Sequence, residues 1–264
     1  MLSQHSFDAV VGLFHQVSGI HLTAAKRSLV EGRLQKLALA RGLNDLDSYV
    51  QHLMQERDPQ ELVRVVDKLT TNETYFFREP QHFEALRQLL AQRRPGQGAF
   101  RVWSAASSSG EEAYSIAMVL ADTLGPQGWE VIGTDLSTAM VDSARRGLYP
   151  LERARDLPPA YLKRFCLKGH GDYNGHLLIH KDLRARVQFG SANLTQELPA
   201  IGDFDLIFLR NVLIYFDMAG KADVVRRVLT RLRPDGRLFT GHAESLANLG
   251  LPVQGLAPAV YRHA

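Results

Sequence analysis

The sequence has one cysteine in 264 residues and no long apolar run. Cys166 cannot form an internal disulfide, and the lack of a second cysteine excludes a zinc site built on cysteine pairs. The N-terminal residues show no basic stretch followed by an apolar core, so we expect no signal peptide. The run AYSIAMVLA is about half as long as a membrane span, so we expect no membrane insertion. A cytoplasmic protein is the simplest interpretation.

Strong charge of either sign is also missing. The formal net charge is +3 at pH 7, which is too small to indicate nucleic acid binding by itself. Hydrophobic residues make up 45% and charged residues 22% of the chain, as in ordinary globular proteins. A chain of this length holds one large domain or two of moderate size.

The first 69 residues lack the alternating Val, Ile and Thr runs that mark strands. Apolar residues recur every three or four positions, as in Phe7, Val10 and Phe14, and this spacing predicts helices. Gly19 and Gly42 interrupt the pattern. We therefore predict a small all-α N-terminal domain of about four short helices.

One predicted helix, from about Thr23 to Arg41, is basic. Its Lys26, Arg33 and Lys36 fall roughly on one face. A solvated helix face and a docking surface for an acidic partner both account for this pattern.

From about Phe100 onward, strands alternate with helices. FRVWSA, WEVIGTDLS, FDLIFL and GRLFTGH have strand character, and helical patterns lie between them. This alternation predicts a parallel, doubly wound α/β sheet in a second domain over 70–264. Ligands of such sheets bind at the carboxyl ends of the strands.

The loop after the first of these strands, AASSSGEE, has one glycine where a dinucleotide site has three. Glu111 and Glu112 stand where a pyrophosphate would sit, and they would repel it. A sulfonium compound with an amino acid tail carries positive charge on its sulfur and on its ammonium group, and both groups suit these carboxylates. S-adenosylmethionine (SAM) therefore fits better than NAD, although both glutamates also suit the first turn of a helix.

The second strand ends in Gly-Thr-Asp. An acidic residue there, Asp135, is well placed to accept hydrogen bonds from ribose hydroxyls. The alternative role is to cap the next helix, which Ser137 can also do.

Residues 70–80, TTNETYFFREP, are an unusual linker. Three aromatic residues stand beside polar ones, whereas linkers are commonly small and polar. By itself this composition favours a buried seam between the two domains.

Three strings together resemble the chemotaxis-receptor glutamate methyltransferases, the CheR family. They are TTNETYFFRE, SAASSSGEEAYSIA and FDLIFLRNVLIYFD, and the likeness extends over nearly the whole chain. The resemblance implies a doubly wound class I SAM-methyltransferase sheet after an all-α domain. It also implies transfer of a methyl group from SAM to glutamate side chains on the cytoplasmic helices of bacterial chemoreceptors, with S-adenosylhomocysteine as product.

Motif by motif, the resemblance implies a cofactor site drawn from distant segments. Its residues are Asn72, Thr74, Arg78, Glu112, Asp135, Asn193, Leu194, Arg210 and Asn211. Arg78 and Tyr215 would lie nearest the transferred methyl group, with Arg78 orienting the incoming carboxylate. Residues 70–80 would then form a lid, with Phe76 and Phe77 packed against the sheet or the adenosine.

The sequence also predicts an inserted three-stranded antiparallel subdomain at about 163–190. Its expected strands are 164–167, 176–180 and 183–189. Asn174 and Gly175 form a strong hairpin signal. In the family such a subdomain can bind a peptide from the receptor's C-terminus by strand addition, and a hairpin without a ligand is the alternative. His176 and His180 have no apparent third ligand, so we expect no metal site.

The resemblance further implies that the basic face of Lys26, Arg33 and Lys36 docks glutamate-rich receptor helices. Two other functions stay open. One is a SAM-dependent O-methyltransferase of the same fold that acts on a small molecule or RNA, although RNA calls for a more basic surface. The other is a regulatory module that binds SAM or S-adenosylhomocysteine without turnover.

Overall fold

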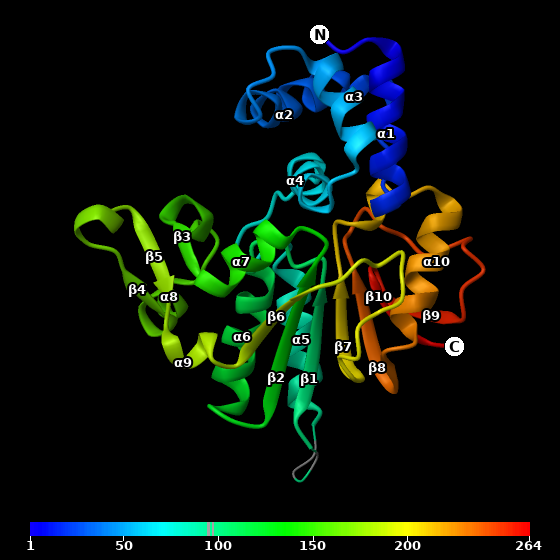
Figure 1. The fold of residues 1–264 in the computed structure, drawn as a ribbon. Coiled ribbons are helices and arrows are strands. Elements are labelled where there is room, and N and C mark those ends of the chain that lie inside the picture. Colours follow the sequence, from blue (N-terminus) through cyan, green and yellow to red (C-terminus); the bar gives the residue numbers. More distant parts are fainter. Residues whose placement is uncertain (94–95, 97) are drawn as a thin grey trace.

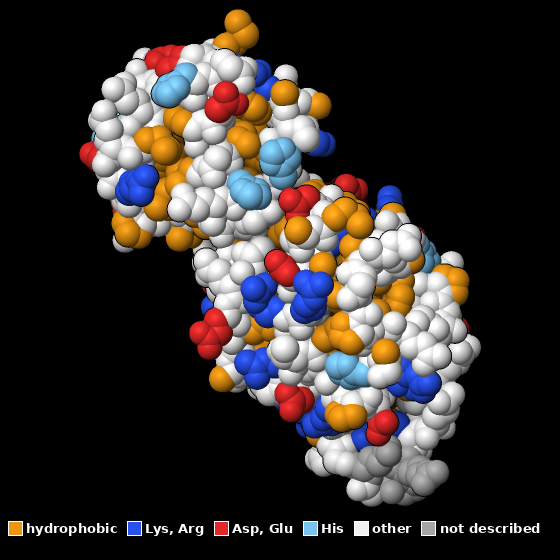
Figure 2. Space-filling model, turned by 90° about the vertical axis from the view of Figure 1, so that its right-hand side faces the viewer, with side chains coloured by type: hydrophobic (Ala, Val, Ile, Leu, Met, Phe, Trp, Pro, Cys, Tyr) orange, Lys and Arg blue, Asp and Glu red, His pale blue; other side chains and the backbone are white. Residues whose placement is uncertain are grey.

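A computed structural model describes residues 1–93, 96 and 98–264. The chain forms a small helical lobe seated on a larger α/β lobe (Figure 1). Figure 2 shows the narrowed waist at which the two lobes meet. Within the described ranges, no helix is both long enough and apolar enough to cross a bilayer.

The N-terminal lobe is entirely helical where it is regular. It contains α1 (Gln4–Ser18), a 3-10 helix (Ala24–Lys26), α2 (Arg27–Ala40), α3 (Leu46–Glu56) and α4 (Pro59–Leu69). The side chains of Ser3, Asp45 and Asp58 accept backbone N–H bonds and so cap α1, α3 and α4. Phe14 and Tyr49 are fully buried at the centre of the bundle. The prediction of a small all-α N-terminal domain is confirmed.

The larger lobe is built on a mixed sheet. Its strands are β1 (Phe100–Ala105), β2 (Trp129–Asp135), β6 (Val187–Ser191), β7 (Phe204–Leu209), β8 (Leu232–Thr240), β9 (Val253–Ala257) and β10 (Val260–His263). Among the described residues the strand order is β6-β2-β1-β7-β8-β10-β9. The first five strands in this order, β6, β2, β1, β7 and β8, pair in parallel. Strand β10 pairs antiparallel with both β8 and β9. The predicted doubly wound sheet is confirmed, and the order reverses between β1 and β7.

Helices cover both faces of this sheet (Figure 1). They are α5 (Gln81–Ala91), α6 (Glu111–Leu124), α7 (Thr138–Arg146) and α10 (Met218–Leu229). Successive strand residues point to opposite faces, so Val102 packs into the apolar cluster of α5 and α6, and Trp103 into that of α10. Burial on both faces explains the nearly continuous apolar strands.

A second, smaller sheet forms the predicted antiparallel subdomain. It contains β3 (Leu148–Pro150), β5 (His176–Ile179) and β4 (Cys166–Lys168) in that order, next to α8 (Pro159–Phe165). The subdomain is confirmed, but one expected strand, 183–189, is wrong. That segment contains the end of α9 (Lys181–Arg184) and the start of β6, which pairs in parallel with β2 in the main sheet. Leu148–Pro150 takes its place, and three residues are too few to show an alternating pattern.

The predicted hairpin joins β4 to β5 through residues 169–175. Gly175 adopts a left-handed φ of 80°, as the hairpin signal requires, but the turn is longer than two residues. Gly169 lies so close to its own loop that a Cβ there would be 2.0 Å from the Tyr173 carbonyl oxygen. Glycine is therefore required at the base of this loop.

The loop after α1 docks the helical lobe on the larger lobe. The Asn193 side-chain amide donates to the Val17 carbonyl at 2.7 Å, and the His21 N–H donates to the Tyr215 carbonyl at 3.3 Å. A Cβ on Gly19, whose φ is 72°, would lie 2.5 Å from a methyl group of the larger lobe. The glycine thus lets the two backbones approach closely.

Candidate active site

A cavity of about 480 Å³ lies between the lobes, at the carboxyl ends of the central strands. Its wall comes from the N-terminal loop, the connecting segment and the loops after β1, β2, β6 and β7. The predicted residues on this wall are Asn72, Thr74, Arg78, Glu112, Asp135, Asn193, Leu194, Arg210, Asn211 and Tyr215. The fold therefore brings every predicted cofactor and catalytic residue to one cavity.

The loop after β1 turns sharply into α6. Gly110 caps the helix at a φ of 96°, and a Cβ there would lie 2.8 Å from the Ala144 side chain. Ala106 and Ser108 also have left-handed backbones, with φ values of 64° and 48°. Such strained turns are common where a loop must approach a ligand, and this one aims the start of α6 at the cavity.

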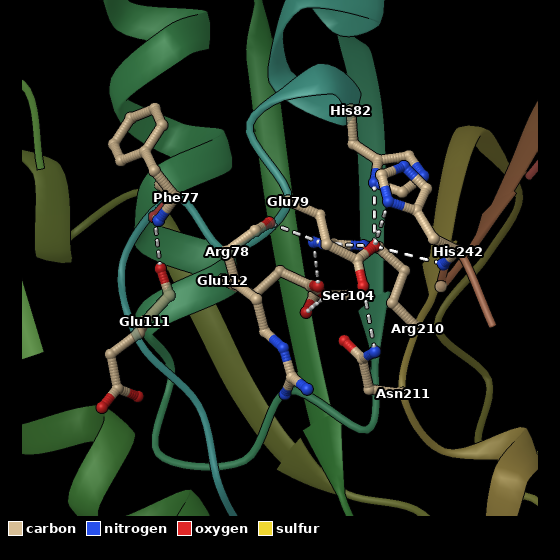
Figure 3. A network of polar contacts seen from close by, with 12 residues as sticks. Phe77, Arg78, Glu79, His82, Ser104, Glu111, Glu112, Arg210, Asn211 and His242 are labelled. Carbon is tan, nitrogen blue, oxygen red and sulfur yellow. Dashed lines mark hydrogen bonds and ion pairs between the residues drawn. The ribbon is translucent and has the colours of Figure 1, made fainter. Parts of the chain in front are cut away.

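The two glutamates that begin α6 point in different directions (Figure 3). Glu111 is fully buried and accepts hydrogen bonds from Ser109 at 2.7 Å and Arg153 at 2.9 Å. Glu112 lines the cavity and accepts from Arg210 at 2.9 Å. The expectation that both carboxylates face the cofactor is therefore wrong for Glu111. Successive helical residues diverge by about 100°, so only one of the pair reaches the cavity.

Asp135 ends β2 on the cavity wall and is 6% exposed. Its two oxygens accept N–H bonds from Ser108 at 2.8 Å and Ser137 at 2.9 Å. Burial raises the pKa of Asp135 to about 6, and these hydrogen bonds oppose the rise. Ser137, not Asp135, caps α7, because its side chain accepts the Met140 N–H. The Asp135 carboxylate retains lone pairs for a ligand.

Residues 70–80 have an apolar side and a polar side. Phe76 and Phe77 are buried in the core, where they contact Tyr149 and Phe83 with ring centroids 5.0 and 4.7 Å apart. Neither lines the cavity, so they pack on the fold and not against a ligand. The polar residues of the segment other than Glu79 line the cavity instead. Phe76 and Phe77 are buried, as the seam interpretation expected, but they lie within the core of the larger lobe and not between the two domains. Tyr75 is only half-buried.

Arg78 stands on the cavity wall near Tyr215. Its guanidinium donates to the Glu73 carbonyl at 2.9 Å and lies 5.8 Å from the Tyr75 ring centroid. Among the residues that the structure describes, no carboxylate oxygen lies within 4.0 Å of it. Burial raises the pKa of Tyr215, although Arg78 opposes the rise, so the phenol stays a donor at neutral pH.

Arg210, at the end of β7, is the most enclosed cation of the site (Figure 3). Its side chain is 1% exposed and forms ion pairs with Glu112 at 2.9 Å and Glu79 at 3.1 Å. Next to it Asn211 has a left-handed φ of 57°, and its amide donates to Glu79 at 3.2 Å. Arg210 lines the cavity, but protein groups already occupy both terminal nitrogens of its guanidinium.

Comparisons with known proteins decide the family. The model of the CheR methyltransferase all-alpha domain matches residues 5–70, and that of the CheR methyltransferase SAM-binding domain matches residues 72–254. The chain belongs to the CheR methyltransferase family. The chemotaxis protein methyltransferases of Salmonella typhimurium and Escherichia coli K12 are each 41% identical over 94% of this chain, and the matches cover 86% and 87% of those proteins. Chemotaxis protein methyltransferase 2 of Pseudomonas aeruginosa is 36% identical over 99% of this chain and 94% of its own length.

SAM is the cofactor of the CheR family, and the cavity fits it. The wall offers Asp135 for hydroxyl groups and Glu112 for a cationic group. Ser107 supplies an independent sign of a polar ligand. Its hydroxyl is buried on this wall and has no hydrogen-bond partner among the described residues. Buried polar groups without partners are uncommon, so a ligand hydrogen bond is expected there.

The sequence did not indicate that the loop after α1 covers one side of this cavity. Ile20, His21, Leu22 and Thr23, from the loop after α1, line it from the helical lobe. The only signal in the sequence was Gly19, which marked a break between helices. Nothing local indicated that the break would face residues about 50 to 200 positions away.

The basic residues of the helical lobe have separate surroundings. Lys26 is exposed and lies at the cavity, and Lys36 is exposed elsewhere. The Arg33 guanidinium donates to the carbonyls of Leu69 and Thr70, both at 2.9 Å, at the end of α4. Arg33 therefore caps α4 and fixes the start of the connecting segment, which a surface charge pattern cannot reveal.

Replacing Arg33 by alanine should lower the free energy of unfolding by about 1–2 kcal/mol, because two carbonyls lose a charged donor. Lys36→Ala is the matched control, since Lys36 is a nearby exposed cation on the same helix. It should change stability by less than about 0.5 kcal/mol. Urea denaturation followed by circular dichroism measures both. Equal effects would show that Arg33 is an ordinary surface charge.

Glu79, His82 and His242 bring possible ligand atoms within 4.8 Å of one another. The two histidine rings are stacked, with centroids 4.8 Å apart and planes 27° apart. Because the lone pair of a ring nitrogen lies in the ring plane, the lone pairs of two stacked rings do not converge on one point. Glu79 is already paired with Arg210. We therefore assign no metal ion to this trio.

Proposed function

We propose that the protein is a protein-glutamate O-methyltransferase that transfers the methyl group of SAM to glutamate side chains of chemoreceptors in the cytoplasm. Family membership and relatives named as chemotaxis protein methyltransferases support the receptor substrate. The observation that carries glutamate specificity is the state of Arg78, a cation on the cavity wall without a carboxylate within 4.0 Å among the described residues. A substrate carboxylate supplies the missing partner, and the planar guanidinium fits its two oxygens.

When bound, SAM supplies a methyl group on a positively charged sulfur. We assign its binding to wall residues from five segments. They are Asn72, Thr74, Arg78, Glu112, Asp135, Asn193, Leu194, Arg210 and Asn211. Asp135 accepts from the ribose hydroxyls, and Glu112 faces the cationic part of the molecule. Arg210 acts mainly through Glu112, whose carboxylate it holds.

The residues of the chain need only bind and align the reactants. A glutamate side chain has a pKa of about 4.3, so the attacking oxygen is ionised at neutral pH and needs no general base. Arg78 orients the carboxylate, and Tyr215 supplies a second donor beside it. The N-terminal loop covers one side of the cavity and so limits the access of water from that side. Alignment of this kind can lower a barrier by roughly 7–11 kcal/mol.

We propose that the receptor helices lie across the mouth of this cavity. Lys26 provides a positive charge there, complementary to glutamate-rich helices. Lys36 is exposed on the same lobe away from the cavity and would meet a receptor helix only beyond the mouth. Ile214 lies on the cavity wall and, with Met218, is more than half exposed, so apolar side chains of the helix have a contact surface. Arg33 adds little to docking, because its guanidinium caps α4.

The antiparallel subdomain is a second proposed contact with receptors. Among the described residues β4 is an edge strand, and Leu167 on it is 50% exposed. An extended peptide from a receptor C-terminus adds to such an edge through main-chain hydrogen bonds. Tethering would raise the effective concentration of the enzyme near its substrate glutamates. Titration with the peptide measures this directly, and no binding would remove the proposal.

The function is tested by incubating the full chain with methyl-labelled SAM and cytoplasmic fragments of chemoreceptors. We expect label that mild alkali releases as methanol, because glutamate methyl esters hydrolyse whereas ethers and methylated bases do not. Mass spectrometry should place the modification on glutamates. Alkali-stable label would favour an O-methyltransferase with another substrate. Binding of SAM without transfer to any fragment would favour a regulatory module.

A further inference from the structure

A single guanidinium connects the connecting segment to the cofactor wall (Figure 3). The Nη2 atom of Arg210 donates to the backbone carbonyl of Arg78 at 2.6 Å and to Glu79 at 3.1 Å. Its Nη1 atom donates to Glu112 at 2.9 Å. Because the Arg210 side chain is 1% exposed, water does not compete for these contacts. The position of the Arg78 backbone thus depends on how Arg210 is held.

The turn that carries Arg78 is strained. Phe77 and Glu79, on either side of it, have left-handed φ values of 55° and 56°. Such a backbone costs of order 1–3 kcal/mol for a residue with a side chain and persists only where surrounding contacts hold it. These contacts include the Phe77 N–H to Ser115 at 3.0 Å on one side and the Arg210 network on the other. Loosening either would let the turn relax and move the Arg78 side chain.

We infer that Glu79 is a positioning residue for methyl transfer, acting through Arg210 on the turn that presents Arg78 to the acceptor carboxylate. Glu79 does not line the cavity, so it has no direct contact with either reactant. Its carboxylate accepts hydrogen bonds from the Arg210 guanidinium, the Asn211 side-chain amide and the His242 backbone N–H. This inference rests on the proposed function, because the acceptor that Arg78 orients is the glutamate carboxylate.

The buried His82 does not compete with Arg210 as an ionic partner of Glu79. His82 is 2% exposed, with one ring nitrogen 3.4 Å from Glu79, and burial lowers its pKa to about 4. It is therefore neutral at pH 7. Burial by itself would raise the pKa of Glu79. The charge of Arg210 and the hydrogen bonds that Glu79 accepts from Arg210 and Asn211 outweigh burial and hold this pKa below its usual value. The strong partner of Glu79 is thus the arginine.

The first test is kinetic. Glu79→Gln should lower the turnover number ten- to thirtyfold while SAM affinity, measured by calorimetry, stays within about threefold. In an Arg78→Ala background the same change should lower turnover by less than about threefold, because no guanidinium remains to be misplaced. Glu84→Gln removes an exposed carboxylate from the next helix, α5, and should leave turnover unchanged. Equal losses in both backgrounds would overturn the inference.

The second test does not depend on the substrate. Hydrogen exchange on the full chain should show faster exchange at residues 76–80 in Glu79→Gln than in the wild type or Glu84→Gln. Glu79→Asp keeps the charge and should give intermediate exchange and turnover, which guards against a variant that fails to fold. Unchanged exchange in Glu79→Gln would overturn the inference. Wild-type enzyme that leaves receptor glutamates unmethylated would instead overturn the proposed function, and the exchange result would still report on the turn.

Discussion

Replacing Arg78 by alanine should lower the turnover number for methyl transfer by about 10²–10³-fold, as removal of an oriented donor does in other active sites. Although Arg78 is among the nine residues assigned to SAM binding, SAM affinity should change by less than about threefold, because Asp135, Glu112 and the other wall residues stay in place. The loss falls on turnover because the guanidinium holds the acceptor carboxylate in line with the methyl group. Calorimetric titration with SAM, paired with turnover on receptor fragments, separates the two quantities.

Arg155 offers the matched control for this experiment. It lies over the same Tyr75 ring, 4.6 Å from its centroid, but is 67% exposed and does not line the cavity. Arg155→Ala should leave turnover and SAM affinity unchanged. Arg78→Lys should recover part of the loss, since lysine keeps the charge without the planar pair of donors. Unchanged turnover in Arg78→Ala would reject the orienting role.

Asp135→Asn should weaken SAM binding about ten- to a hundredfold, because the ribose loses a charged hydrogen-bond acceptor. Asp142→Asn is the control, since Asp142 lies on the neighbouring helix α7 and is 62% exposed. It should bind SAM like the wild type. Calorimetry at pH 7.5 measures both affinities, and thermal melting of the unliganded variants checks that each is folded. Affinity in Asp135→Asn equal to that of the wild type would remove Asp135 from the cofactor site.

The raised pKa of Asp135 adds a dependence on pH. Below its value of about 6 the carboxylate is protonated in the unliganded protein, whereas the ribose hydroxyls favour the ionised form. SAM affinity should therefore be full above about pH 7 and fall as the pH drops through 6, to about a tenth at pH 5. The Asp135→Asn variant should show a flat profile over the same range. An equally steep profile in the variant would assign the titration to another group.

The strand ends of this site were predictable because the strands that carry it run parallel. Asp135 ends β2, whereas Asn193 and Arg210 follow β6 and β7, and parallel strands bring their carboxyl ends to one edge. The short motif at each strand end therefore determined which residues meet. The same logic accounts for the correct sheet class, since strands alternating with helices leave few other arrangements.

The errors concern contacts between distant parts of the chain. Glu111 points away from the cavity, where its carboxylate accepts a hydrogen bond from Arg153, 42 positions later. Arg33 caps carbonyls 36 and 37 positions away. The segment expected as the third strand of the subdomain instead completes the main sheet, because the edge of β2 is free to pair. In each case the local sequence allowed two conformations or pairings, and contacts with a distant part of the chain determined which one forms.

The loop after α1 has a consequence for how the protein can be divided. Because Ile20, His21, Leu22 and Thr23 cover the cavity, cutting the chain after α4 would remove one wall of the reaction chamber. A catalytic fragment that begins at residue 70 would leave the methyl donor open to solvent on that side. The helical lobe thus completes the chamber that holds the reactants, and a chimaera with another N-terminal domain would need a loop that covers the same side.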